Sequence, residues 1–383
     1  MSRKDIHGTC GHQRSDTMRR TPLYEEHISA GARMVDFAGW EMPIQYQGII
    51  DEHMAVRNAA GIFDVSHMGD VLISGPTAKD LLLRLLTNDI SKLPVSKAIY
   101  AHFLNEEGKI MDDTIVYRLG EEEYLLIPNA STTETILDWI GRHRTDQTVV
   151  DVSSRVACIA LQGPASVRIL QMLTEDDVSS IGHFACRAID LGLPSGDLMW
   201  GAKVLAARTG YTGEDGYELM LDSSLSVGVW RRLLLEGKQD GIIPAGLGCR
   251  DTLRLEMGYL LSGTDFDGSQ SSVQTGPSWV IKWDHDFIGR EALKADSERK
   301  DLPRLVCIEL RARGIPRHGY PIEFEGEQVG HITSGTFSPS LKRGVSMGYL
   351  PPELAREGQS VDVVIRNERV PAEVIRPPFL KKR

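Results

Sequence analysis

The chain has 383 residues, 41% hydrophobic and 25% charged, a globular balance in a length that usually forms two or three domains. Its net charge of −10 and pI of about 5.6 argue against a general nucleic-acid-binding protein. No apolar run approaches the ~20 residues of a membrane span, so we expect neither nucleic acid nor membrane as a partner.

Residues 1–20 are mixed in charge and lack the apolar core of a signal peptide, so we expect either a disordered extension or an upstream start codon, with Met18 as the start of the folded chain. His7, Cys10 and His12 form only a weak metal-binding pattern within it. The five cysteines of the chain are far apart and odd in number, which favours reduced thiols and a cytoplasmic location over a disulfide framework.

Strands and helices alternate without a regular period over residues 21–298. Segments 74–90 and 161–177 each turn at Gly-Pro and then continue as an amphipathic helix. Ser131, with Glu134 three residues later, has the pattern of a capping box at a helix start. The alternation predicts an α+β fold with largely antiparallel sheets. The predicted strands include GDVLIS, AIYAHFLN, DTIVYRL, EYLLIP, RVACIALQ and AKVLAAR.

Two acids lie inside the apolar run IMDDTIVYRL, which predicts a strand. Since side chains of a strand alternate between faces, Asp113 shares a face with Tyr117, while Asp112 lies on the other. A buried acid is costly unless something binds it. Either one acid therefore lines a pocket, or one caps a turn at the strand edge. Tyr100, on a predicted neighbouring strand, would add an aromatic wall to a pocket.

The stretch RTGYTGEDGYEL (208–219) places a glycine at every third position and ends near Glu218. The spacing matches neither G-x-G-x-x-G nor the Walker loop, which argues against a bound nucleotide. Such glycines are typical of positive φ or of close backbone approach to a flat or bulky group. Two interpretations stay open, a tight acidic hairpin and a loop that presents Glu218 to a ligand. A carboxylate there suits a ring edge with two parallel N–H donors.

Two other motifs have plain interpretations. Arg250 and Arg254 lie four residues apart, hence on one helix face, where acidic neighbours can pair with them. Ser66 and His67 are adjacent in sequence, but adjacency does not make a nucleophile and its base, and no nucleophile elbow surrounds them. We therefore do not expect a serine hydrolase.

The sequence changes character near residue 302. The segment ADSERKDLPR (295–304) is charged and ends in proline, which predicts a linker or, alternatively, a solvated helix end. The short alternating runs that follow, broken by Gly, Pro and Asn, are typical of a small β-barrel or sandwich. We expect a separate all-β domain over residues 302–383.

In chain order, these stretches resemble the glycine-cleavage T-protein family of aminomethyltransferases, from Thr21 to nearly the end. The shared motifs are TPLYEEH, FAGWEMPIQY, FDVSHMG, the Asp-Asp strand, LQGP, GYTGEDGYE, AGLGCRDTLRLE, FIGREAL and TSGTFSPSLKRGVSMGY. The resemblance implies a three-lobed cloverleaf around a central folate channel. Two α+β lobes, one inserted in the other, would occupy residues 21–298, and a C-terminal β-barrel residues 302–383.

The resemblance also implies a reaction. T-proteins move a one-carbon unit from aminomethyl-lipoyl H-protein to tetrahydrofolate, release ammonia and form 5,10-methylenetetrahydrofolate. The matching motif makes Asp113 the catalytic carboxylate, which suits a reaction with a cationic intermediate. No metal or nucleotide is implied. The implied folate-binding residues are Glu218, Arg250, Tyr211, Tyr117, Tyr100, Met68 and Asn129.

The chain departs from the family pattern at three places. Lys109 follows Gly108 where many relatives have Gly-Gly. Ser271, Ser272 and Gln274 stand where a Thr-Pro-x-Glu element is expected. The C-terminal PPFLKKR lacks an aromatic residue that some relatives place over the ligand. These changes are compatible with a folate site, and they leave more than one class of one-carbon donor open.

Two related functions therefore stay open. A tetrahydrofolate-dependent demethylase would take a methyl group from a small donor, and its 5-methyltetrahydrofolate product would identify it. A non-enzymatic folate-binding module of the iron–sulfur assembly class is disfavoured, because the chain retains Asp113 and lacks the Lys-Gly-Cys-Tyr motif of that class. We do not expect a flavin-fused dimethylglycine or sarcosine oxidase, because the chain is short and lacks G-x-G-x-x-G.

Overall fold

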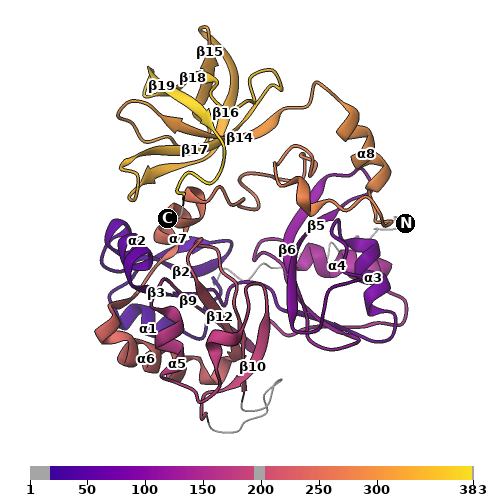
Figure 1. Ribbon diagram of the computed structural model, residues 1–383, viewed down its shortest axis with the longest axis vertical. Helices are drawn as coiled ribbons and strands as arrows, with labels where there is room; N and C mark the ends of the chain where they lie inside the picture. Colours follow the sequence, from indigo (N-terminus) through magenta and orange to yellow (C-terminus); the bar gives the residue numbers. More distant parts are fainter. Residues whose placement is uncertain (1–17, 194–202, 382–383) are drawn as a thin grey trace, which may run out of the picture.

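The computed structural model describes residues 18–193 and 203–381, which form three lobes around a common centre (Figure 1). The strands of the first lobe are β3 (Ala60–Asp64), β9 (Val156–Gln162), β10 (Cys186–Asp190), β11 (Lys203–Ala207), β12 (Gly216–Asp222) and β13 (Ile242–Pro244). They form one sheet in the order β10-β11-β12-β9-β3-β13. The pair β13–β3 is parallel, and the other neighbours in this sheet are antiparallel.

Helices and a hairpin cover this sheet. They are α1 (Tyr24–Ser29), β1 (Arg33–Phe37), β2 (Trp40–Gln45), α2 (Ile49–Asn58), α5 (Ser166–Gln171), α6 (Ser226–Glu236) and α7 (Leu247–Glu256). Every residue of β9 is buried, because the strand lies inside the sheet with helices packed on it. Ile159, Leu161, Leu219 and Trp230 belong to the resulting core.

The second lobe is an antiparallel sheet in the order β5-β6-β7-β4-β8. Its elements are β4 (Val71–Ser74), α3 (Ala78–Leu85), β5 (Lys97–Leu104), β6 (Ile110–Arg118), β7 (Glu123–Ile127), α4 (Thr133–His143) and β8 (Thr148–Asp151). All of them lie in sequence between β3 and β9 of the first lobe, so the second lobe is an insertion. Val71 of the first inserted strand pairs with Asp151 of the last, so the chain enters and leaves side by side.

The third lobe is a closed barrel in the order β14-β17-β16-β15-β18-β19. Its strands are β14 (Arg304–Leu310), β15 (Pro321–Phe324), β16 (Glu327–Ser338), β17 (Arg343–Leu350), β18 (Ser360–Ile365) and β19 (Glu368–Ile375). The α+β architecture with a C-terminal barrel agrees with the predicted fold class. Within residues 18–193 and 203–381, no helix is long and apolar enough to cross a membrane.

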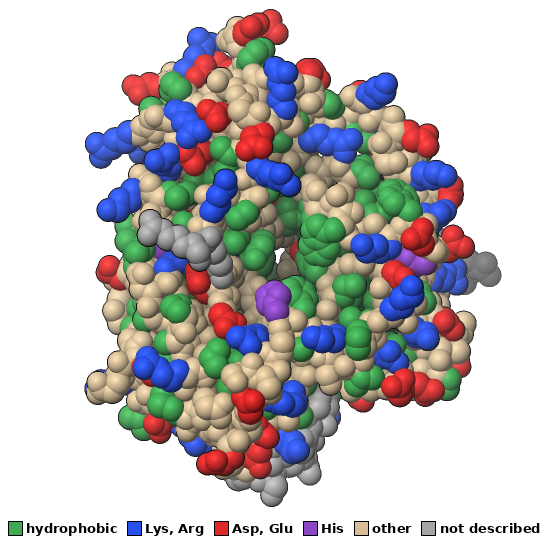
Figure 2. All heavy atoms as spheres, viewed as in Figure 1, with side chains coloured by type: hydrophobic (Ala, Val, Ile, Leu, Met, Phe, Trp, Pro, Cys, Tyr) green, Lys and Arg blue, Asp and Glu red, His purple; other side chains and the backbone are tan. Residues whose placement is uncertain are grey.

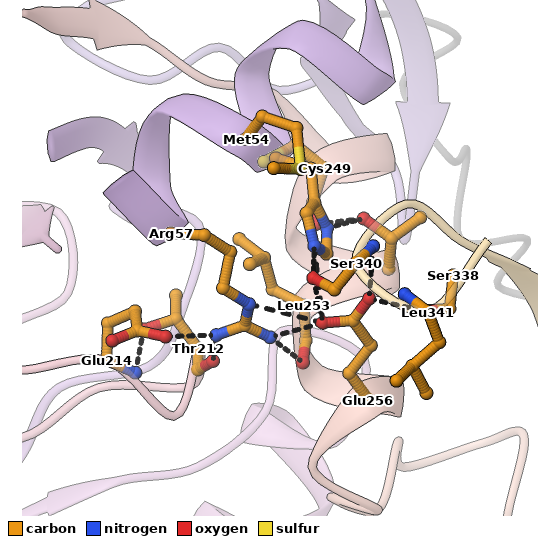
Figure 3. A network of polar contacts seen from close by, with 12 residues as sticks. Met54, Arg57, Thr212, Glu214, Cys249, Leu253, Glu256, Ser338, Ser340 and Leu341 are labelled. Atoms are coloured by element: carbon orange, nitrogen blue, oxygen red, sulfur yellow. Dashed lines mark hydrogen bonds and ion pairs between the residues drawn. The ribbon is translucent and has the colours of Figure 1, made fainter. Parts of the chain in front are cut away.

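Helix α7 lies between the first lobe and the barrel (Figure 1), and buried charges join them there. Arg57 of α2 donates to Glu256 of α7 at 2.8 Å and to Glu214 at 2.8 Å (Figure 3). The Glu256 carboxylate also accepts from the hydroxyls of Ser338 and Ser340, at the end of β16. Its Oε2 lies 3.2 Å from Nε2 of His53 on α2. These contacts fix the barrel against two helices of the first lobe.

Three local predictions need correction. The predicted capping box is wrong, because the hydroxyls of Thr132 and Thr133 donate to the Asn129 carbonyl and no side chain caps α4. The predicted linker begins too early, because α8 (Arg290–Glu298) includes its first four residues. The predicted disordered extension is wrong for Arg19, whose amide donates to the Gly39 carbonyl at 2.9 Å. The rest of that extension up to residue 17, including the weak metal pattern, lies outside the described residues.

Candidate active site

The predicted site residues lie on the first and second lobes, where their contacts join Tyr100, Asp113 and Asn129, Tyr117 and Glu218, and Arg250 and Tyr211. Figure 2 shows an opening, here called the junction, where the lobes converge, with hydrophobic side chains along its rim. The second lobe supplies four of the predicted residues, and the first lobe supplies the others. Those from the second lobe are Tyr100 (β5), Asp113 and Tyr117 (β6) and Asn129, which precedes α4. Met68 lies between β3 and β4, Tyr211 in the glycine-rich loop, Glu218 on β12 and Arg250 on α7.

Asp113 is half-buried and accepts hydrogen bonds from two neutral side chains. Tyr100 Oη donates to its Oδ2 at 2.8 Å, and Asn129 Nδ2 donates to its Oδ1 at 2.7 Å. Burial and the charge of Asp112 raise the pKa of Asp113 to about 7, although the bonds from Tyr100 and Asn129 act in the opposite direction. A carboxyl group with this pKa exchanges a proton near neutral pH.

Asp112 has a different environment. It is fully buried and accepts from the backbone N–H of Asn129 at 3.0 Å and from the Asn129 amide at 2.8 Å. Ser262 Oγ donates to it at 3.1 Å. The strand places the two acids on opposite faces as predicted, since residues of β6 alternate between buried and half-buried from Asp112 to Val116. Asp112 thus anchors the turn before α4, and Asp113 faces the junction of the lobes.

Glu218 lies opposite, on the first lobe. Thr209 Oγ1 donates to Glu218 Oε2 at 2.5 Å, and Tyr117 Oη donates to the same oxygen at 3.4 Å. The hydroxyls of Tyr117 and Thr209 are themselves 2.8 Å apart. Tyr117 is buried and comes from the second lobe, so this cluster joins the two lobes beside the junction. Nothing in the sequence pattern indicated Thr209 as the neighbour of Glu218.

The glycines of the loop before Glu218 approach a flat group that belongs to the chain itself. The buried side-chain amide of Gln162 lies against Gly210 and Gly216, where an added Cβ would come within 2.1 and 2.5 Å of it. Its Nε2 donates to the Thr209 carbonyl at 3.1 Å, and its Oε1 accepts from Thr212 at 2.7 Å. Because Gly210 and Gly216 have no side chains, the loop can fold closely around Gln162.

Arg250 and Tyr211 form another part of the junction. The Arg250 guanidinium lies over the Tyr211 ring, with Cζ 4.8 Å from the ring centroid, which suits a cation–π contact. Among the described residues, Nη1 of Arg250 is buried and finds no hydrogen-bond partner. Of the two acids predicted to pair with these arginines, Asp251 pairs with Arg254 at 2.7 Å, whereas Glu256 pairs with Arg57. Arg254 also pairs with Asp265 at 2.8 Å. An unpaired buried N–H is costly, so Arg250 suits a ligand acceptor.

The Ser66–His67 pair does not form a catalytic dyad. Ser66 Oγ accepts from the Cys158 amide at 3.1 Å, so it is bound to the backbone of β9. His67 is buried beside Arg250, and burial together with that charge lowers its pKa to about 4. Met68 follows directly and packs on the hydrophobic cluster between the two lobes.

Two departures from the family pattern have structural explanations. Lys109 Nζ lies 2.7 Å from Asp296 Oδ2, an ion pair that connects the turn before β6 to α8. Gln274 turns inward, accepts from the Ser271 amide at 3.0 Å and donates to the Pro303 carbonyl at 3.3 Å. Over the described part of the chain, no group of three or more His, Cys, Asp or Glu is arranged to hold a metal ion.

Comparisons with known proteins agree with this architecture. The GCVT N-terminal domain model matches residues 23–285, and the glycine cleavage T-protein C-terminal barrel domain model matches residues 304–381. An aminomethyltransferase of Halothermothrix orenii is 44% identical, covering 95% of this chain and 100% of its own. One from Rubrobacter xylanophilus is 45% identical, covering 96% of this chain and 95% of its own.

A solved structure is also similar. The crystal structure of glycine cleavage system aminomethyltransferase T from Bartonella henselae has a TM-score of 0.86 and 29% sequence identity. The match covers 95% of this chain and 98% of that one. With both domain models matched and two full-length relatives above 40% identity, the chain belongs to the aminomethyltransferases of the glycine cleavage T-protein family.

Proposed function

We propose that the protein transfers the one-carbon unit of an aminomethyl group, carried by lipoyl H-protein, to tetrahydrofolate. Ammonia and 5,10-methylenetetrahydrofolate are the products. The observation that carries this proposal is the Asp113 carboxylate, half-buried at the junction of the lobes between the hydroxyl of Tyr100 and the amide of Asn129. The full-length similarity to aminomethyltransferases supports the same reaction class. A cytoplasmic location is part of the proposal.

The residues at the junction fit a folate. Glu218 supplies a carboxylate for the amino-pyrimidinone edge of a pterin, which carries parallel N–H donors. Arg250 supplies a buried N–H that lacks an acceptor among the described residues. Tyr100 and Tyr117 add aromatic surface from the inserted lobe, and Met68 adds apolar surface from the connection between β3 and β4. Tetrahydrofolate therefore contacts both lobes in this proposal, with Glu218 and Arg250 on one side and Asp113 on the other.

Asp113 has two tasks in the reaction. As an anion, it stabilises the positive charge that develops when the amine leaves the one-carbon unit. With a pKa of about 7, raised by burial and by Asp112, it also accepts a proton from an amine at neutral pH. Tyr100 and Asn129 hold the carboxylate in place for both tasks.

The test is anaerobic turnover of the purified chain with tetrahydrofolate and aminomethyl-loaded H-protein, with the folate product and ammonia measured together. We expect both products in equal amounts. In Asp113→Asn we expect kcat to fall by about 10²- to 10⁴-fold, the usual contribution of such a group, with folate affinity largely retained. Wild-type activity in Asp113→Asn would contradict the role assigned to Asp113.

A second candidate function has one observation in its favour. The segment that carries Ser271, Ser272 and Gln274 lacks the expected carboxylate, and the amide of Gln274 is occupied within the protein. A changed donor site would suit a demethylase that accepts a methyl group from a small molecule. If tetrahydrofolate binds but H-protein supports no turnover, formation of 5-methyltetrahydrofolate from methylated amines would identify that function.

A further inference from the structure

Four hydrogen-bonded side chains form a line that runs from Asp113 away from the junction. Tyr100 Oη lies 2.8 Å from Asp113 Oδ2 and 3.1 Å from His102 Nε2. His102 Nδ1 lies 2.9 Å from Ser272 Oγ. His102 and Ser272 are buried, at 0% and 1% exposure. No sequence motif pointed to His102, and Ser272 stands where the family resemblance predicts a proline.

The valence of each group fixes which atom donates while Asp113 is ionised. A hydroxyl has one hydrogen, so Tyr100, which donates to Asp113, must accept from Nε2–H of His102. His102 is neutral, because burial lowers its pKa to about 3, and its other ring neighbour, Phe266, does not titrate. A neutral imidazole carries one N–H, so Nδ1 is bare and Ser272 donates to it.

When Asp113 is protonated, the same hydrogen bonds form with donor and acceptor exchanged in each. The carboxyl O–H donates to Tyr100, Tyr100 donates to His102 Nε2, and His102 Nδ1–H donates to Ser272. The Ser272 hydrogen is then no longer bound to His102, and Ser272 lines a cavity of about 220 Å³ together with Trp283 and Arg304. One proton enters at the cavity, one reaches Asp113, and each bond between them reverses. Tyrosine and histidine are neutral in both end states.

We propose that Ser272, His102 and Tyr100 form a proton path between that cavity and Asp113, in which His102 changes tautomer whenever Asp113 changes protonation state. The proposal rests on the proposed function, in which Asp113 is the reacting carboxylate. Folate and the lipoyl arm would close the junction to water during the reaction. A path on the opposite side of Asp113 lets the carboxylate exchange its proton while the junction is closed. His102 and Ser272 are thus positioning residues that act through Tyr100.

The other groups that face Asp113 do not replace this path. Asp112, on the same strand, is held by Asn129 and Ser262, away from the line. Asn129 does not titrate. Tyr211, on the first lobe, stays neutral because burial raises its pKa well above the ordinary value. Exchange through any of these groups would leave the His102 tautomer unchanged.

Nitrogen-15 NMR of the histidine rings reads the tautomer directly in the full chain, with His102→Gln used to assign the signals. We expect the Nε2–H form about two pH units above the midpoint of Asp113, and the Nδ1–H form about two units below, with no imidazolium between. In Asp113→Asn the switch should be absent. A single tautomer at both pH values, or a protonated ring, would overturn the proposal.

Two neighbouring serines provide a matched pair of variants. Ser272→Ala removes the partner of Nδ1 in both end states, its donor while Asp113 is ionised and its acceptor while Asp113 is protonated. Because a buried N–H without an acceptor is the costlier of the two losses, we expect the tautomer midpoint, and the acidic limb of kcat, to move down by roughly 0.5 to 1 pH unit. Ser271→Ala loses an equally buried hydroxyl whose one hydrogen bond within the described residues goes to Gln274, at 3.4 Å, and should leave both midpoints unchanged. Equal shifts in the two variants would contradict the path.

Each of the two proposals can be disproved without the other. The tautomer switch needs neither folate nor H-protein, so it tests the path even if the protein turns over a different donor. If the protein turns over with H-protein but the His102 tautomer does not change with pH, the proposed function stands and the proton path is disproved.

Discussion

At the residue scale, the candidate site divides its work between two carboxylates with different surroundings. Asp113 has a pKa raised to about 7 by burial and by Asp112, and it suits proton exchange. Glu218 is held by the hydroxyls of Thr209 and Tyr117, and it suits recognition of hydrogen-bond donors. In the proposed function, the first acts in the chemical step and the second in binding.

Glu218→Gln tests this division. The amide replaces one acceptor of the carboxylate by a donor, which leaves a ligand N–H unpaired and costs about 1–3 kcal/mol. We expect the Kd and KM for tetrahydrofolate to rise about 10- to 100-fold, while kcat at saturating folate changes little. Equilibrium binding and steady-state kinetics measure both. Glu123→Gln, at an exposed position of β7, is the control and should behave as wild type. A fall in kcat alone would contradict the binding role.

Tyr100→Phe is the matching test of the chemical step. Loss of the hydroxyl removes a hydrogen bond that stabilises the ionised carboxylate, so the pKa of Asp113 should be higher in the variant than the value of about 7 in the wild type. If the ionised form is the active one, kcat rises with pH through this pKa, and the variant needs a higher pH to reach its plateau. A pH profile of kcat between about pH 5.5 and 9 measures the shift. An unchanged acidic limb would show that Tyr100 does not set the protonation of Asp113.

At the element scale, α7 serves the site and the barrel at once. Arg250 on this helix reaches the junction, whereas Arg254 donates to Ser334 of the barrel at 2.8 Å. Glu256, at the end of the helix, accepts from Arg57 of α2 and from serines near the end of β16 (Figure 3). Helix α7 therefore connects the barrel to the candidate site.

Arg57→Met tests the buried network. The change leaves Glu256 and Glu214 without their shared cation, and breaking a buried pair in this way costs about 3–5 kcal/mol of unfolding free energy. Urea unfolding followed by fluorescence measures the loss. Arg231→Met is the control, because Arg231 is 68% exposed in its pair with Glu26 and such pairs contribute about 0–1 kcal/mol. Equal losses in the two variants would show that the network does not join the lobes.

At the scale of the whole molecule, we expect acid to weaken the contact between the first lobe and the barrel. Burial alone would raise the pKa of Glu256, but the bonds and charges of His53, Ser338 and Arg57 lower it to about 2, from an ordinary 4.5. A carboxyl with a depressed folded pKa stabilises the fold above its unfolded pKa. That contribution is therefore complete above about pH 4.5 and is lost as the pH falls toward 2.

The comparison with Glu256→Gln isolates this effect. The variant has no carboxyl at this position, so its unfolding free energy should depend less on pH between about 5 and 3 than that of the wild type. Urea unfolding at both pH values gives the difference. Parallel pH dependence in the two proteins would assign the acid sensitivity to other groups.

The sequence predicted the α+β fold class and the C-terminal barrel because alternation and glycine breaks are local signals. Every predicted strand of the described chain is present, and Asp113 and Asp112 lie on the faces that alternation assigns. What it missed depends on contacts between distant residues. Arg57 and Glu256 are 199 positions apart, and nothing near either one indicates the other. Likewise, Gly210 and Gly216 are needed because the Gln162 side chain lies against them, and this contact exists only because β9 pairs with β12.

The insertion of the second lobe has a consequence for synthesis on the ribosome. All strands of that lobe lie between Val71 and Asp151, so they emerge consecutively and can pair as soon as β8 appears. The surrounding sheet must wait, because β3 pairs with β9 and β13, which are made later. During that interval β3 is an unpaired apolar strand, the kind of exposed surface on which chaperones act. A growing chain therefore completes the lobe that carries Asp113 before the one that carries Glu218.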